Sequence, residues 1–190
     1  MFYYALCLFV ICTCFIIFKL VIYLVTRLPS IVIRCSIVAS RLDYCNSLLY
    51  GASSMSLDRL QRSQVMLARV VMQSSSRNSA RPLLQSLHWL PVRECINYKV
   101  ATLTFKARRM SVPPYLNSLL NDHVPSRTLR LSSTPHLIIP RTRTELAKRA
   151  FSVAAPALWN GLPADVVDAN SLLSFKKHLK THLYQCAYYT

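Results

Sequence analysis

The chain has 190 residues, and its 23 Lys and Arg against 7 Asp and Glu give a formal net charge of +16. An excess of this size predicts attraction to polyanions, either nucleic acid or an anionic lipid surface. The presence of only 2 glycines against 10 prolines argues against a glycine-rich nucleotide loop and favours helices interrupted by prolines.

The first 25 residues form an apolar run. Residues 1–18 (MFYYALCLFVICTCFIIF) carry no charge, and after Lys19 the run continues as LVIYLV. Crossing a bilayer takes about 20 mostly apolar residues, so residues 1–26 are expected to form a transmembrane helix, followed by a basic connector at 27–36. Because the cationic residues all lie downstream of the uncharged residues 1–18, at Lys19, Arg27, Arg34 and Arg41, the positive-inside rule places the rest of a single-pass protein in the cytoplasm. The alternative is that the run never meets a membrane and has no selected role, which leaves the chain in the cytoplasm or nucleus.

The seven cysteines do not predict a disulfide framework. Their number is odd, no pair has CxxC spacing, and three of them lie in the apolar run. A reducing compartment such as the cytosol or nucleus suits this pattern.

Residues 37–190 are predicted to be mainly α, as short helices punctuated by prolines. Helices are expected from Ser54 or Ser56 to about Gln73, from Pro82 to Leu87, over 92–109, from Pro113, and after a cap at Asn170 or Ser171. The first should carry its apolar side on Leu57, Leu60, Met66, Leu67, Val70 and Val71. The last should carry an apolar seam of Leu172, Phe175, Leu179 and Leu183. In the third, Lys99, Lys106, Arg108 and Arg109 should face solvent.

The sequence also allows one small β-hairpin around residues 137–153. LIIP (137–140) and FSV (151–153) are β-prone pieces on either side of a polar stretch. Pro140 would confine the first of them to an edge or to a strand end.

Several strings in this region are distinctive as a set: SRLDYCNSLLYG (40–51), LDRLQRSQVMLARVV (57–71), LLQSLHWLPVRECINYKVATLTFKA (83–107), PRTRTELAKRAFSVAAPALWNGLP (140–163) and SFKKHLKTHLY (174–184). In this order and spacing, residues 37–190 resemble the region downstream of the polymerase in LINE-type, jockey-like non-LTR retrotransposon reverse transcriptases. Residues 1–36 do not share the resemblance.

The resemblance implies a part of the enzyme that lacks the catalytic unit. In such elements the polymerase palm carries metal-binding aspartates, including an adjacent pair, and many elements also carry an endonuclease upstream. Here no two acidic residues are adjacent, and the nearest pair is Asp165 and Asp168. Two-metal nucleotidyl transfer needs carboxylates converging on ions about 4 Å apart. We therefore expect no catalytic residues, no cofactor and no small-molecule substrate.

The candidate nucleic-acid-binding residues form a basic cluster that includes a single acid, Glu145. Because guanidinium forks suit phosphate, the cluster predicts non-specific contact with the backbone of RNA or DNA. A solvated basic face is the alternative. His136, Phe151 and Trp159 lie close in sequence and could stack on bases, although Trp89 and Trp159 are more readily explained as core anchors beside Leu-Pro motifs. The cluster consists of Arg127, Arg130, Arg141, Arg143, Lys148 and Arg149.

One spacing suggests a metal site. His178, His182 and Cys186 follow each other at four-residue intervals and would share a helix face, but no fourth ligand is evident. We expect an ordinary helix face and no metal.

Overall fold

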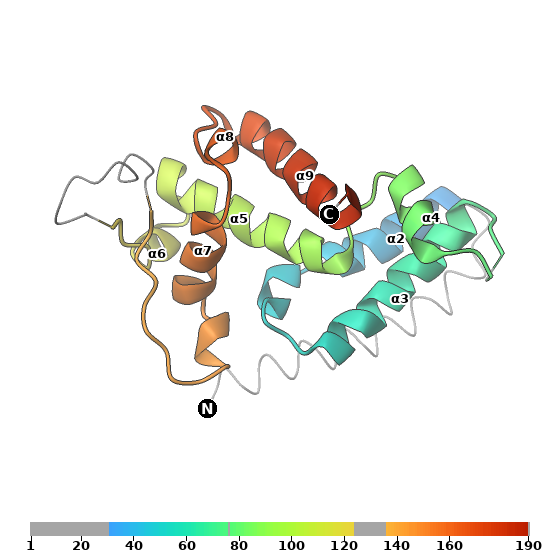
Figure 1. The fold of residues 1–190 in the computed structure, drawn as a ribbon, viewed down its shortest axis with the longest axis horizontal. Helices are drawn as coiled ribbons and strands as arrows, with labels where there is room; N and C mark the ends of the chain where they lie inside the picture. Colours follow the sequence, from blue (N-terminus) through green and yellow to red (C-terminus); the bar gives the residue numbers. More distant parts are fainter. Residues whose placement is uncertain (1–30, 76, 124–135, 190) are drawn as a thin grey trace. The chain divides into compact units, whose positions relative to one another are not determined.

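The computed structural model describes residues 31–75, 77–123 and 136–189. These residues form helices and turns without a β-strand, which confirms the mainly α prediction (Figure 1). None of the helices in the described ranges combines the length and hydropathy needed to cross a bilayer. The predicted transmembrane helix, residues 1–26, lies outside those ranges.

The chain divides into two compact units. The described residues within Met1–Leu48 and Ser53–Val92 belong to unit 1, and those within Leu49–Ala52 and Arg93–Thr190 belong to unit 2.

Unit 1 is built around α3 (Ser54–Val71), which packs against α2 (Ile31–Asp43) and α4 (Ala80–Ser86). The cap of α3 is Ser53, whose hydroxyl oxygen accepts from the backbone N–H of Ser56. The helix therefore starts slightly earlier than expected. A short 3-10 turn, η1 (Asn46–Leu49), precedes it in the chain, and within Leu49–Ala52, which belong to unit 2, the backbone reverses at Gly51 with φ +69°. Glycine adopts this left-handed conformation without the steric cost that a Cβ brings.

The buried face of α3 differs from the predicted one. Leu57 and Leu67 are buried as expected, but Met66 and Val70 are exposed. In their place the helix buries Val65, Ala68 and the polar Gln64. The Gln64 side-chain N–H donates to the backbone carbonyl of Leu90 at 2.8 Å, and a buried amide that has such a partner costs little to bury.

Unit 2 contains most of α5 (Val92–Met110), then α6 (Pro114–Asn117), η2 (Ala147–Arg149), α7 (Phe151–Asn160), α8 (Ala164–Val167) and α9 (Leu172–Tyr189). The predicted seam of α9 is confirmed at Phe175, Leu179 and Leu183, which are buried, while Leu172 is only half-buried. The hydroxyl oxygen of Ser171 accepts from the Ser174 backbone N–H and caps this helix.

Three aromatic rings join three helices of unit 2. The rings of Phe105 on α5 and Phe175 on α9 stack at 4.4 Å between centroids. The Trp159 ring on α7 stacks on Phe175 at 5.9 Å. All three side chains are nearly inaccessible to solvent, so this aromatic stack forms the centre of the core.

The predicted β-hairpin around 137–153 is wrong. Residues 151–153 begin α7 instead, in an alanine-rich segment of high helix propensity. Leu137 forms only an isolated antiparallel bridge, and its partner is Asp122, on the N-terminal side of the chain. The helical surroundings of residues 151–153 thus outweighed their β-propensity, and Leu137 pairs with a partner that the sequence did not indicate.

Truncation of the central ring should be costly. The Phe175→Ala variant is expected to lose about 3–5 kcal/mol of unfolding free energy, because the change removes both stacking contacts and leaves a cavity. Urea unfolding followed by circular dichroism measures the loss. Leu173→Ala on the same helix is the control, since Leu173 is 81% exposed and the change should stay within about 0.5 kcal/mol. Equal losses in the two variants would contradict this description of the core.

Candidate nucleic-acid interface

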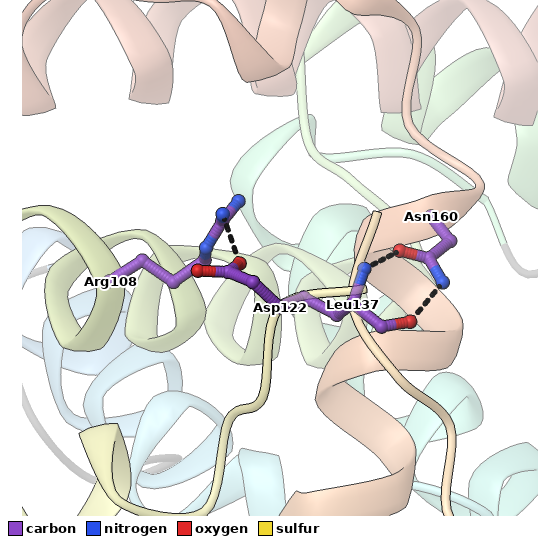
Figure 2. A network of polar contacts seen from close by, with 4 residues as sticks. All are labelled: Arg108, Asp122, Leu137 and Asn160. Atoms are coloured by element: carbon purple, nitrogen blue, oxygen red, sulfur yellow. Dashed lines mark hydrogen bonds and ion pairs between the residues drawn. The ribbon is translucent and has the colours of Figure 1, made fainter. Parts of the chain in front are cut away.

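The basic segment 141–149 leaves the core of unit 2 at Leu137, and Asn160 on α7 fixes that point. The Asn160 side-chain oxygen accepts from the Leu137 backbone N–H at 2.8 Å, and its side-chain N–H donates to the Leu137 carbonyl at 2.9 Å (Figure 2). One amide thus satisfies both backbone groups of a residue that is only 3% exposed. A buried backbone needs such partners, so Asn160 here replaces a neighbouring strand.

On its other edge, the backbone around Leu137 pairs with residues 121–123. The His123 backbone N–H donates to the His136 carbonyl at 2.9 Å, and that of Ile138 to the Asn121 carbonyl at 2.8 Å. Asp122 also accepts from the Arg108 guanidinium on α5 at 2.5 Å (Figure 2). Leu137 is therefore held between residues anchored on α5 and on α7.

Arg108 is not the solvent-facing residue that helix periodicity predicts. Its side chain is 18% exposed, and besides its ion pair with Asp122 its guanidinium lies 5.3 Å from the centroid of the Trp159 ring. A cation over an indole face is favourable, more so when it is shielded from water. Arg108 therefore links the aromatic stack to the start of the basic segment.

Beyond Pro140 the predicted basic residues are on the surface. Arg141, Arg143, Lys148 and Arg149 are all exposed. Glu145 is the one acid among them, and it accepts from the Lys148 ammonium at 2.6 Å. Both groups of this pair are more than half exposed, so the pair contributes little to stability. Arg127 and Arg130, the other two members of the predicted cluster, lie outside the described residues.

Two local features shape the end of this segment. The Thr144 hydroxyl oxygen accepts from the backbone N–H of Ala147, which starts the 3-10 turn η2. A Cβ added at Gly51 would lie 3.0 Å from Cγ of Arg149, so the absence of a side chain at Gly51 leaves room for the arginine stem. Gly51 thus has a steric role in addition to its left-handed backbone.

The aromatic residues near the cluster differ in accessibility. Trp159 is 2% exposed, which excludes it as a base-stacking platform and confirms its role as a core anchor. Phe151 is half-buried, and His136 is exposed.

A cavity of about 50 Å³ is lined by His136, Trp159, Asn160 and Asp168, among others. Among the described residues, the Trp159 Nε1–H has no hydrogen-bond partner. The cavity has room for a water molecule but not for a nucleobase.

The three potential metal ligands on α9, His178, His182 and Cys186, do not share one partner. His178 Nδ1 lies 3.2 Å from the backbone oxygen of Asp165, while His182 Nε2 lies 3.7 Å from Sγ of Cys186. Within the described part of the chain, no three His, Cys, Asp or Glu side chains come together as metal ligands. Near the end of the same helix, desolvation and, second, the neighbouring Tyr189 raise the pKa of Tyr184.

Asp165 and Asp168, the two acidic residues nearest to each other in the sequence, lie at the surface. Asp165 is in the first turn of α8, Asp168 follows that helix, and both are exposed. An acid in the first turn of a helix interacts favourably with the helix dipole, which accounts for Asp165 without catalysis.

No known protein family, curated protein or solved structure matches this chain.

Sequence patterns had no means of locating Asn160 and Arg108, which build the base of the candidate interface. Their partners are 23 and 14 positions away in the chain, beyond the reach of helical periodicity. Asn160 stands in the string LWNGLP, but nothing in the local spacing indicates that its amide binds the backbone of Leu137.

Removal of the Asn160 amide should loosen the segment locally. In Asn160→Ala the Leu137 backbone N–H and carbonyl lose their partners, with an expected cost of about 1–3 kcal/mol in unfolding free energy. Urea unfolding measures that cost, and hydrogen exchange at the Leu137 amide, which should become faster, shows where it arises. Asn170→Ala, at an exposed asparagine, is the control. Unchanged Leu137 exchange in Asn160→Ala would refute the anchoring role.

Proposed function

We propose that this chain is a catalytically inactive remnant of a LINE-type retrotransposon reverse transcriptase that binds RNA or DNA without sequence specificity. The single observation that carries the binding proposal is the surface of segment 141–149. It exposes Arg141, Arg143, Lys148 and Arg149 and contains one acid, which pairs with Lys148. The retrotransposon origin is supported by the sequence strings between residues 37 and 190.

Phosphate is the part of a nucleic acid that this segment suits. Arginine presents a planar fork of N–H donors that matches phosphate oxygens, and each contact releases condensed counterions. Sequence readout needs side chains placed against base edges, or aromatic faces for stacking. With Trp159 inside the core, the segment favours contact with the backbone.

The absence of polymerase activity is part of the proposal. Asp122 pairs with Arg108 and Glu145 with Lys148, so these two carboxylates are engaged in ion pairs. Nucleotide addition needs carboxylates that converge on two ions. Primer extension by the purified chain, abolished by Asp165→Asn together with Asp168→Asn, would overturn this part of the proposal.

Neutralisation of the arginines tests the binding proposal. The Arg141→Gln, Arg143→Gln double variant should bind a single-stranded RNA more weakly and reduce the slope of log K against log salt by about 1–2, since two phosphate contacts are lost. Fluorescence anisotropy over a salt series gives both values. Arg77→Gln with Arg93→Gln removes the same charge from two exposed positions elsewhere and should leave the slope nearly unchanged. If the two double variants have equal slopes, attraction by net charge alone accounts for binding.

The second candidate is a single-pass membrane protein whose basic part lies on anionic lipid. The apolar run of residues 1–25, interrupted only by Lys19, favours it. The remaining candidate is a decayed open reading frame that has no function. Detection of peptides from this chain in cells would show that the protein is made, and would reject a reading frame that is never translated.

Extraction of cell membranes with alkaline carbonate tests the second candidate. If residues 1–26 span a bilayer, the expressed full chain stays in the membrane pellet, and a chain that begins at residue 37 moves to the supernatant. Recovery of the full chain in the supernatant would remove the membrane candidate.

A further inference from the structure

Helix α3 in unit 1 carries a stripe of methionine and arginine along its solvent side. Met55, Arg59, Arg62, Met66 and Val70 follow each other at intervals of three or four residues, so they line one face of the helix. Met55 is 66% exposed, Met66 54% and Val70 44%. Arg59 and Arg62 are exposed between them. We refer to these five residues as the Met–Arg stripe.

The stripe lies opposite the core face of the helix, and hydrogen bonds hold the core face in place. Gln64 donates to the Leu90 carbonyl at 2.8 Å, and the Gln61 side-chain oxygen accepts from the Val92 backbone N–H at 2.8 Å. Rotation of α3 to bury the stripe would break both bonds and expose Ala68, which is now fully buried. The methionines are therefore a surface of the folded unit and not an alternative core.

The charged residues of α3 are mostly positive. The helix has three arginines and a single acid, Asp58, which is not part of the stripe. The Arg59 guanidinium lies 4.0 Å from Sδ of Met55, so cation and thioether share one surface. Arg69, at the flank, donates to the Asn78 carbonyl and is held against unit 1.

We propose that the Met–Arg stripe is a docking surface for an acidic amphipathic helix of a partner protein. Flexible, polarisable methionine side chains adapt to the apolar face of an incoming helix. Arg62 lies between them, where a carboxylate flanking that apolar face can accept from its guanidinium fork. From Met55 to Val70 the stripe spans about 22 Å at the helical rise of 1.5 Å per residue, the length of about four turns of a partner helix.

Two other polyanions fit less well. RNA would pair with the arginines, but it would cover three apolar side chains with phosphate and sugar, and the stripe has no aromatic ring for base stacking. A membrane-surface helix keeps an apolar face separate from its cationic flanks. Here the arginines lie within the apolar row, and the continuous apolar face of α3 is buried in unit 1. Alternating apolar and charged contacts instead match the side of an acidic helix.

The test uses the full chain and a synthetic helical peptide of about 20 residues, with leucines at i, i+4 and i+7 spacing flanked by glutamates. Fluorescence anisotropy should give a micromolar dissociation constant, as expected for a contact this small. Arg62→Glu and Met66→Ser should each weaken binding about tenfold, the effect of losing one central contact. A peptide with lysine in place of glutamate should bind Arg62→Glu better than it binds the unaltered chain.

Two matched variants distinguish binding by the stripe from attraction by net charge and from non-specific hydrophobic binding. Arg77→Glu makes the same charge change at an exposed arginine of unit 1, and Met110→Ser removes a methionine that is 53% exposed, as against 54% for Met66. Both should change peptide affinity less than twofold. The proposal is overturned if these controls weaken peptide binding as much as the stripe variants. It is also overturned if Arg62→Glu and Met66→Ser weaken binding only to polyuridine RNA or to vesicles of phosphatidylcholine and phosphatidylserine.

Discussion

The stacking of Phe105, Phe175 and Trp159 is the contact on which unit 2 depends. It is the point at which α5, α7 and α9 share one desolvated surface, with ring centroids 4.4 and 5.9 Å apart. Large aromatic side chains bury more apolar area than any other residue type, so a unit of this size gains much of its core from three of them. Through Trp159 the same stack supports the Arg108 guanidinium, and through Arg108 it reaches Asp122.

The sequence predicted what helical periodicity encodes. Three of the four seam residues of α9, the extent of α5 and a cap at Ser171, one of the two expected positions, follow from local spacing, and the structure confirms them. The prediction failed where a distant hydrogen bond decided the outcome. Gln64 is buried on α3 because the Leu90 carbonyl accepts its N–H, while Met66, which is more apolar, remains outside. Likewise, Leu137 is not in a hairpin because Asn160 binds its backbone.

The sequence was sufficient to predict which basic residues of the candidate site are exposed, but not which contacts hold the site in place. That Arg141, Arg143, Lys148 and Arg149 are exposed follows from the cost of burying unpaired charge. Their common support on Asn160 and Asp122 depends on side chains more than a dozen positions away. The two basic surfaces proposed here also differ in kind. Segment 141–149 places cations beside turns and polar groups, whereas the Met–Arg stripe places them among methionines, so the first suits phosphate and the second an apolar and acidic surface.

The double hydrogen bond between Asn160 and Leu137 has an evolutionary consequence. It lies at the entrance to the basic segment and involves none of its charges, so the arginines beyond it can mutate without disturbing the packed interior. Genetic drift could therefore erase the proposed nucleic-acid affinity while the polypeptide still folded. In a lineage of such chains, persistence of the arginines would be a record of selection for binding, because selection for folding alone does not preserve them.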